Sequence, residues 1–331
     1  MGTAFAFKYD DEEVLKGSSS GGAFFALSNY ILENDGIVYG AVYDFENNNV
    51  IHTRANNIRD RERMKGSKYL QSKIGDTFFE VSKDLEKGRQ VLFSGTMCQV
   101  VALKKYLSAK NISIDKLLTC DIICHGVASP LIWKQYIEYK SPQKLKFINF
   151  RSKELGWMNS KAIAQNDVNK IDLSDYMKLY YSHTIMRPSC HTCGFSSTVR
   201  QSEITIGDFW GIEKLDLDFN YNNGLSFVMA NNEKGKLLLE NTTKFNAKIK
   251  IREVNINDVK QPNFYSPTRA SVIRERLWKD YRKKGISYIL KKYTSDALFC
   301  RILVFLQKVM DSIFNKKGGL EFETVTNHAD L

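Results

Sequence analysis

The stretch "RQVLFSGTMCQVVALKKYLSA", residues 89–109, decides the fold. Its first part is a short apolar run that predicts a buried strand, and this strand ends at the small residues Ser94, Gly95 and Thr96. The apolar spacing then changes to that of a helix. The next stretch, "KLLTCDIICHGVASPLIWKQYIEYK" (116–140), repeats the order of strand, loop and helix. Alternation of this kind predicts an α/β core.

The residues before this stretch extend the same pattern. Apolar positions at helical spacing follow the loop "SSSGG" and predict a helix over 23–32. Two short apolar runs, 37–44 and 50–55, flank "FENNN" and predict a β-hairpin. A further helix is expected to end at Gly88. The carboxyl ends of the strands, and the loops after them, are expected at one edge of the sheet, where open α/β sheets bind ligands.

After residue 140 the pattern changes to strands separated by turns. Strands are expected within 144–159, 160–167, 202–212 and 224–232, and helices over 174–186 and 232–243. We therefore predict an α/β protein with a mixed sheet and flanking helices in residues 1–140. A second, α+β region that carries a C-x-x-C loop is expected at 141–265, and a basic, amphipathic helical tail at 266–331.

The predicted tail combines positive charge with an apolar run. The chain has a formal net charge of +11, and nine cations lie between Arg269 and Lys292. The later run "ALFCRILVFLQKVMDSIF", 297–314, is short and charge-interrupted for a bilayer span, so we expect an amphipathic helix. Packing on the protein body and peripheral contact with a membrane both explain it. Nucleic-acid binding is not expected, because no module signature accompanies the cations.

Composition indicates a folded protein in a reducing compartment. The 331 residues are 43% hydrophobic and 26% charged, which is typical of globular chains. Six cysteines are too few for a disulfide scaffold in a chain of this size. The N-terminus lacks the basic and apolar regions of a secretory signal. We therefore predict a cytoplasmic protein whose cysteines are thiols or metal ligands.

Four of the cysteines suggest a metal centre. "RPSCHTCGF" (187–195) places Cys190 and Cys193 in a tight turn, while Cys98 and Cys124 follow the two predicted strands. If these loops meet at one sheet edge, four thiolates converge, which suits a 4Fe–4S cluster or structural zinc. The wide separation of Cys98 and Cys124 favours a cluster over a zinc knuckle. A redox pair formed by Cys190 and Cys193 alone remains a further alternative.

Three loops of small residues resemble phosphate-binding loops. "GSSSGG" (17–22) and "SGT" (94–96) both precede a predicted helix, where backbone N–H groups and the helix dipole favour anions. "KGSKYLQS" (65–72) adds two lysines beside a glycine. Three such loops within about eighty residues predict a cofactor that bears a diphosphate. The chain contains neither a G-x-G-x-x-G motif nor a P-loop.

Three more residues are candidates for the same site. His125 follows Cys124 directly, and either forms a structural hydrogen bond in a turn, acts as a proton donor or contacts a flavin. Asp208 and Trp210, in "ITIGDFWG" (204–211), end a predicted strand. The carboxylate is suited to hold a hydroxyl of a cofactor and the indole to cover a ring, although both also fit an ordinary turn over the core.

Seven motifs in order resemble the coenzyme F-420 hydrogenase/dehydrogenase beta-subunit family. They cover about residues 15–240: "SSSGGAF", "GSKYLQS", "LFSGTMCQVVALK", "CHGVASP", "FRSKELGW", "RPSCHTCGF" and "RQSEITIGDFWG". The resemblance implies FAD and a 4Fe–4S cluster, with Cys98, Cys124, Cys190 and Cys193 as cluster ligands. Cys120 and Cys300 lie outside the motifs and are expected to be buried thiols.

The resemblance also implies which residues surround the flavin. Lys68 is the expected side-chain contact, and the full set of expected cofactor-binding residues is Ser19, Ser20, Gly21, Gly22, Gly66, Ser67, Lys68, Gln71, Ser94, Gly95, Thr96, Gln99, Asp208 and Trp210. His125 is the expected catalytic residue.

The expected activity is that of an iron–sulfur flavoprotein oxidoreductase. Many relatives carry a ferredoxin-like N-terminal domain, whereas this chain begins almost at "SSSGG". We therefore expect a separate electron carrier such as ferredoxin; the alternatives are that the chain is a fragment or a degenerate form. The acceptor is expected to be a small molecule, coenzyme F-420 or another hydride acceptor, and a homo-oligomer is possible. The alternative is a non-redox protein, zinc-stabilised or without cofactors, that assists assembly of surface polysaccharides.

Overall fold

The fold is built on one large mixed sheet. A computed structural model describes residues 2–212, 215 and 219–295. Nine strands pair in the order β12-β1-β11-β10-β6-β5-β2-β3-β4. Their bounds are β1 Thr3–Tyr9, β2 Ile37–Asp44, β3 Asn49–Ala55, β4 Ser72–Lys73, β5 Val91–Thr96, β6 Leu117–Ile122, β10 Ile204–Asp208, β11 Ser226–Ala230 and β12 Ile249–Val254. The mixed α/β fold predicted from the sequence is confirmed.

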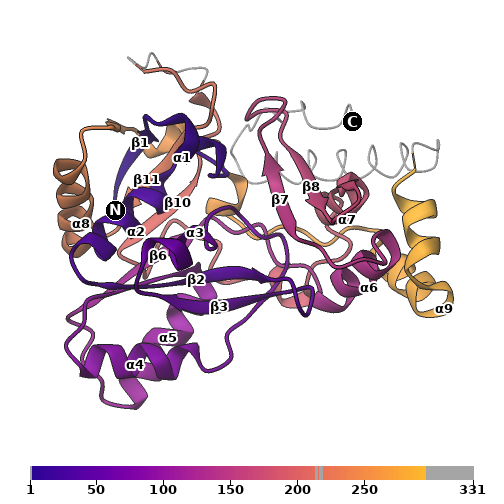
Figure 1. The fold of residues 1–331 in the computed structure, drawn as a ribbon, viewed down its shortest axis with the longest axis horizontal. Helices are drawn as coiled ribbons and strands as arrows, with labels where there is room; N and C mark the ends of the chain where they lie inside the picture. Colours follow the sequence, from indigo (N-terminus) through magenta and orange to yellow (C-terminus); the bar gives the residue numbers. More distant parts are fainter. Residues whose placement is uncertain (1, 213–214, 216–218, 296–331) are drawn as a thin grey trace.

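Helices cover both faces of this sheet. Alternate strand residues point to opposite sides, so Val38 and Leu92 pack under α2 (Ala23–Glu33), while Tyr39 and Phe93 pack under α4 (Thr77–Glu86) and α5 (Met97–Ala109). In Figure 1, α4 and α5 lie below β2 and β3, and α2 lies above them. Three shorter or peripheral helices complete this part: α1 Glu12–Lys16, α3 Ile58–Glu62 and α8 Glu233–Phe245.

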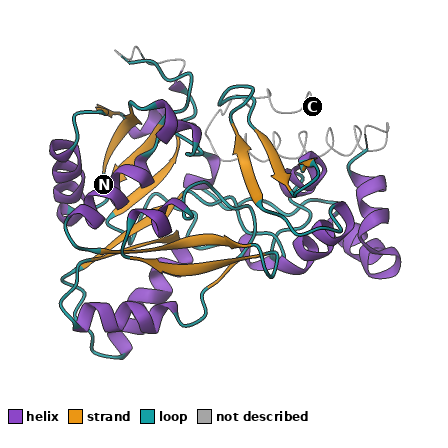
Figure 2. Cartoon of the chain, viewed as in Figure 1, coloured by secondary structure: helices purple, strands orange, loops and turns teal. Residues whose placement is uncertain are grey.

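A second, smaller unit projects beside the sheet. Its three strands pair in the order β7-β8-β9, with bounds Phe147–Ser152, Lys161–Gln165 and Lys170–Asp172. Three helices accompany them: α6 Pro130–Lys140, α7 Ser174–Tyr181 and α9 Arg274–Tyr293. Figure 2 shows the β7–β8 hairpin standing apart from the strands of the large sheet.

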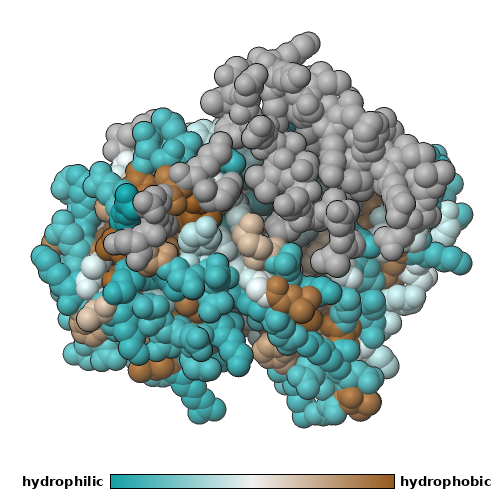
Figure 3. Space-filling view, turned by 90° about the horizontal axis from the view of Figure 1, so that it is seen from above, coloured by the Kyte–Doolittle hydropathy of each residue, from teal (hydrophilic) through white to brown (hydrophobic). Residues whose placement is uncertain are grey.

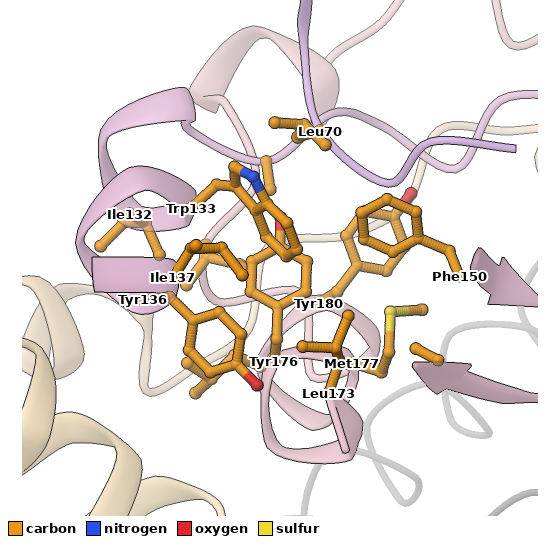
Figure 4. Packing of buried hydrophobic residues seen from close by; sticks show 14 of the residues in the cluster. Leu70, Ile132, Trp133, Tyr136, Ile137, Phe150, Leu173, Tyr176, Met177 and Tyr180 are labelled. Carbon is orange, nitrogen blue, oxygen red and sulfur yellow. The ribbon is translucent and has the colours of Figure 1, made fainter. Parts of the chain in front are cut away.

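Aromatic side chains fill the core of this unit. Trp133 and Tyr136 of α6 are fully buried against Tyr176 of α7, and the Trp133 and Tyr176 ring centroids are 4.7 Å apart. Figure 4 shows these rings facing Phe150, which comes from β7. Such edge-on aromatic pairs add about 0.5–1.5 kcal/mol each to the energy of burial. The core therefore fixes β7, and with it Arg151, relative to α6 and α7.

Three strands of the large sheet, β1, β4 and β12, were not foreseen in the sequence. β1 lies between β11 and β12 and pairs with both, although they follow it by more than 200 residues. Strands from both sides of residue 140 thus share one sheet, and the division at residues 140 and 265 remains a prediction. The amphipathic helix expected at 297–314, like Cys300, lies outside the described residues.

One face of the molecule is largely polar where its residues are described. Figure 3 shows a mostly hydrophilic face on which hydrophobic residues form scattered groups. In the part of the chain that the structure describes, no helix is long and apolar enough to cross a bilayer. The nine basic residues between Arg269 and Lys292 fall largely on α9, whose two halves meet at Gly285 with a φ of 75°.

Candidate functional site

A large cavity lies where β5, β6 and β10 end. These three strands run parallel, and Thr96 of β5 pairs with Ile122 of β6, so the loops that follow them meet at one edge. The cavity has a volume of about 1180 Å³. This exceeds the roughly 300–1,000 Å³ that is typical of small-molecule sites. The sequence prediction that both loops share one sheet edge is confirmed.

The cavity gathers most of the candidate residues. Its lining includes Ser19, Ser20, Gly22, Gly66, Ser67, Lys68, Gln71, Ser94, Gly95, Thr96, Gln99, Cys98, Cys124, His125, Asp208 and Trp210. Three candidates are not part of this lining, namely Gly21, Cys190 and Cys193. Gly21 instead packs against backbone, because a Cβ there would meet Phe7 O and Ser226 N at far less than van der Waals distance.

The first two small-residue loops are bonded to each other. Ser67 N–H donates to Ser19 Oγ at 2.8 Å, which ties the Gly66 turn to the loop before α2. Ser20 Oγ donates to Leu225 O at 2.5 Å, and Gly21 N–H donates to Ser226 Oγ at 2.9 Å. The Ser18–Gly22 loop is therefore held between β11 and the Gly66 turn. Gly22 caps α2 with a φ of 86° and no side-chain bond, and the first residues of α2, Ala23 and Phe24, line the cavity.

Lys68 has a structural role in these loops. Its Nζ donates to the carbonyl oxygens of Ala41 (2.8 Å), Met64 (2.8 Å) and Lys65 (3.0 Å). These three bonds use the donors of the ammonium group and join β2 to the turn that follows α3. Direct contact between Lys68 and a flavin remains a prediction.

The third loop begins α5 with a capping box. Thr96 N–H donates to Gln99 Oε1 at 2.9 Å, and the Thr96 side chain accepts from the backbone of the third helical residue. Gln99 Nε2 also donates to Ser72 Oγ at 2.8 Å. The capping box fixes the start of α5 and so the position of Cys98, which is exposed and whose Sγ lies 3.1 Å from Thr96 Oγ1.

The cysteine-bearing loops approach one another around Gly126. Gly126 N–H donates to Cys124 Sγ at 3.3 Å. Its φ is 118°, and a Cβ at this position would lie 3.1 Å from Cys190 Cβ. Burial, with a contribution from the charges of Cys98, Cys190 and Cys193, raises the pKa of the Cys124 thiol to about 12. Within the described residues, no three His, Cys, Asp or Glu side chains are grouped closely enough to hold a metal ion as they stand.

The loop that carries Cys190 and Cys193 is anchored at both ends to the region of Cys124. At its start, Arg187 N–H donates to Val127 O at 2.9 Å, and Met186 forms a bridge with Ala128. At its end, the guanidinium of Arg200 forms a buried ion pair with Asp121 of β6. The positions of Cys190 and Cys193 therefore follow the position of β6.

An ion pair forms another wall of the cavity. Arg151 Nη1 lies 2.9 Å from Asp208 Oδ2, and both side chains are largely buried. Arg151 also donates to Ser160 Oγ at 2.7 Å and to Tyr69 OH at 3.2 Å. Burial opposes the charge of Arg151, but the Asp208 carboxylate raises its pKa well above the usual value overall. Asp208 thus has a fixed partner, which orients its carboxylate.

Two indoles extend this wall. Trp210 stacks on Trp157 with ring centroids 4.7 Å apart and an interplanar angle of 9°. Trp157 is buried, whereas Trp210 lines the cavity, so one aromatic ring supports another at the site. Beside them, burial lowers the pKa of His125, which keeps its ring neutral at pH 7. The His125 carbonyl oxygen accepts from Thr268 Oγ1 at 2.7 Å.

The comparisons agree with this architecture. The family model for the C terminus of the coenzyme F420 hydrogenase/dehydrogenase beta subunit matches residues 88–257, just over half of the chain. The chain belongs to this family. No curated protein matches it.

The coenzyme F420 hydrogenase/dehydrogenase beta-subunit fold is also visible in a solved structure. A chain of the F420-reducing NiFe hydrogenase complex from Methanosarcina barkeri, studied by xenon derivatization, superposes with a TM-score of 0.50. The match covers 88% of this chain and 90% of that chain at 18% sequence identity. At this identity the likeness supports a shared fold.

The residues that the family model matches form only part of the site. Residues 88–257 span β5 to β12 and contain the four candidate cysteines, His125, Arg151 and Asp208. The Ser18–Gly22 and Gly66–Lys68 loops precede this segment, so the cavity joins the family segment to the N-terminal part of the chain.

Sequence reasoning missed two residues that line the cavity, Arg151 and His52, and one residue, Lys153, that holds the loop before α2. Arg151 lies in the motif "FRSKELGW", but no role was assigned to it, because its partner Asp208 is 57 residues away. Lys153 from the same motif donates to Leu15 O, Ser20 O and Asn223 O, at 2.7–2.9 Å. His52 stacks on Phe93, and its Nε2 lies 3.1 Å from Ser94 O. The position of Arg151, a basic residue in an otherwise apolar strand, could have marked it as a candidate from the sequence.

Proposed function

We propose that this chain is an iron–sulfur flavoprotein oxidoreductase. It would pass electrons from an external one-electron donor through a 4Fe–4S cluster to FAD, and from there to a small hydride acceptor. The family and the fold support the coarser reading, a redox protein of the hydrogenase/dehydrogenase beta-subunit type.

One observation carries the proposal: a single cavity joins the three small-residue loops to Cys98 and Cys124. A diphosphate needs backbone N–H groups at a helix start, and α2 begins at this cavity without a side-chain cap. A cluster needs thiolates, and two of the four line the same space. The volume of about 1180 Å³ leaves room for a large cofactor and an acceptor beside it.

The charge of the lining supports an anionic ligand. Seven basic side chains line the cavity, namely Lys65, Lys68, Lys73, Arg151, Lys161, Lys178 and Arg187. Two carboxylates, Asp172 and Asp208, accompany them among the lining residues. Because low-dielectric walls strengthen such a field, the lining favours a ligand that carries phosphate groups.

The donor set fits an iron–sulfur centre. The four thiols of Cys98, Cys124, Cys190 and Cys193 are soft ligands, and the Cys124 sulfur accepts a backbone N–H. Hydrogen bonds of this kind tune the potential of a cluster. When bound, the cluster would supply single-electron transfer and the flavin would supply hydride transfer, while this chain would bind both, orient them and exclude water. His125, which follows Cys124 directly and lines the same cavity, is the proposed catalytic residue of this site.

The test is anaerobic purification followed by visible spectroscopy with iron, zinc and flavin analysis. The expected protein contains about four iron atoms and one FAD per chain, as a 4Fe–4S flavoprotein requires. A colourless protein with stoichiometric zinc would overturn the proposal and favour the non-redox alternative.

Two alanine variants sharpen this test. Cys190→Ala is expected to lose iron and to retain the fold, because Cys190 is only partly buried. The matched control is Cys120→Ala, since Cys120 is buried in β6 within the core and outside the proposed ligand set. Equal iron content in the two variants would refute the assignment of Cys190.

A further inference from the structure

Three segments around the candidate cysteines contain no acidic residue. They are α5 (Met97–Ala109), residues 183–202 and residues 259–274. In the whole chain, by contrast, Asp and Glu account for 37 of 331 residues. The same three segments carry seven basic residues: Lys104, Lys105, Arg187, Arg200, Lys260, Arg269 and Arg274. Two of them are paired with carboxylates outside the segments, Arg200 with Asp121 and Lys104 with Glu203.

Contacts join these segments into one surface. Phe195 packs against the core cluster that contains Val101 and Leu103 of α5. Lys104 Nζ donates to Gln201 O at 2.6 Å, which ties α5 to the end of the cysteine loop. On the other side of this loop, His191 Nδ1 lies 2.9 Å from Thr268 O. We call the exposed part of the three segments the cysteine face.

The cysteine face exposes both positive charge and a candidate ligand. Cys98, Ala102 and Lys105 are exposed and lie at helical spacing on one side of α5. Seven residues of helix place Lys105 about 10 Å along the axis from Cys98. Arg187, three residues before Cys190, is also exposed. The charge of Lys105 or of Arg187 acts on a partner that approaches the cysteines, since each lies within a Debye length of a cysteine at low salt.

The same face exposes large apolar side chains. Val199, directly before Arg200, is 80% exposed, and Val272 is 57% exposed. Apolar side chains interspersed with arginine are common at protein–protein interfaces, whereas lysine is depleted at their centres and acts in steering. The combination favours a folded protein as partner over a polyanion recognised by charge alone.

We propose that the cysteine face docks an acidic one-electron carrier protein. This inference rests on the proposed function and adds the place of docking and the charge of the donor. In each encounter one electron leaves the reduced carrier and enters the centre held by the cysteines. The carrier departs oxidised by one electron, and no bond is formed or broken.

The first experiment measures binding, which does not depend on flavin reduction. Oxidised plant-type ferredoxin, an acidic protein, serves as the probe for the full-length chain. Lys105→Glu and Arg187→Glu are compared with Lys244→Glu, a matched reversal on the exposed surface of α8. Measurements are made at about 0.01 M and about 1 M salt, where the Debye length is about 30 Å and about 3 Å.

Three results are expected. Lys105→Glu and Arg187→Glu each weaken binding by about threefold to tenfold at low salt, because charge-steered association is strongly sensitive to single charges. Lys244→Glu binds as the wild-type protein does. The difference between the variants disappears at high salt. Equal binding by Lys105→Glu and Lys244→Glu, or wild-type binding without salt dependence, overturns the proposal.

A second measurement separates this inference from the proposed function. Reduced methyl viologen, a small cation, is expected to reduce the bound flavin in wild type and in Lys105→Glu at equal rates. If ferredoxin binds as expected but no donor reduces a flavin, the proposed function fails while the docking surface stands. If vesicles of anionic lipid bind with the same loss in Lys105→Glu and ferredoxin does not bind, the face is a membrane surface and the proposal is wrong.

Discussion

Replacing Gly126 with alanine tests whether the cysteine loops must approach each other closely. Gly126 has a φ of 118°, a conformation that residues with a side chain rarely adopt. Its missing Cβ leaves room for two neighbours, since the added atom would lie 2.9 Å from Met186 Sδ and 3.1 Å from Cys190 Cβ. The Met186 sulfur can move with its flexible side chain, whereas Cys190 Cβ is fixed to the backbone of the proposed ligand loop.

The expected loss of stability follows from the backbone. Alanine at this φ costs about 1–3 kcal/mol as conformational strain. With an unfolding entropy of about 2.1 cal/mol/K per residue, a chain of 331 residues has about 0.7 kcal/mol/K in total, so the melting temperature falls by about 1–4 °C. The displacement of Cys190 adds a second effect, a loss of metal affinity of about 10–100-fold, as for other residues that orient ligands.

The assay compares Gly126→Ala with Gly194→Ala by thermal unfolding and iron content. Gly194 lies next to Cys193, and a Cβ there would meet no atom within 4 Å. The control is therefore expected to keep its iron and to change in stability by less than about 0.5 kcal/mol. If Gly126→Ala retains iron as fully as Gly194→Ala and melts at the same temperature, the close approach of Cys190 to the Cys124 loop is not required.

Three further outcomes are expected from other contacts of the cavity and the sheet. Ser19→Ala removes the acceptor for one backbone N–H and should weaken FAD binding by about 2–10-fold in a titration of the flavin-free protein, the equivalent of one hydrogen bond. Arg151→Met leaves the carboxylate of Asp208 buried and unpaired, so denaturant unfolding should show a loss of about 3–5 kcal/mol; a loss below about 1 kcal/mol contradicts the buried pair. Burial alone would raise the pKa of Asp84, but hydrogen bonds from Arg54 lower it overall. The wild-type protein should therefore have a higher free energy of unfolding than Asp84→Asn, and this difference should be lost as the pH falls through the lowered pKa, below about 4.

Local patterns in the sequence predicted the local structure well. The change from an apolar run to helical spacing at "SGTMC" corresponds to the end of β5 and the start of α5 at Met97. The hairpin expected at 37–55 forms β2 and β3, and the helix expected to end at Gly88 forms α4. In each case the structure is specified by hydrophobic periodicity and capping residues, which lie within about 20 residues of one another in the sequence.

The long-range pairings could not be predicted in the same way. β1 was not foreseen, since its partners β11 and β12 lie near the other end of the chain and nothing local specifies their register. Lys68 looked like a ligand contact beside a glycine. Its Nζ instead donates to three backbone carbonyl oxygens, and a local sequence pattern does not reveal that these lie near Lys68. The Arg151–Asp208 pair depends on how two sheets meet, which is a property of the whole fold.

The placement of β10 explains how distant parts of the chain reach one site. β10 lies directly beside β6, although the whole β7-β8-β9 unit and the cysteine loop separate the two strands in sequence. The chain therefore leaves the sheet after Cys124 and returns at Ile204. Asp121 of β6 pairs with Arg200 just before this return, so the excursion is closed by a buried contact. Loss of the Arg200–Asp121 ion pair leaves a buried charge without its partner. We infer that the loop that carries Cys190 and Cys193 would be displaced before the strands, because no strand pairing holds this loop in place.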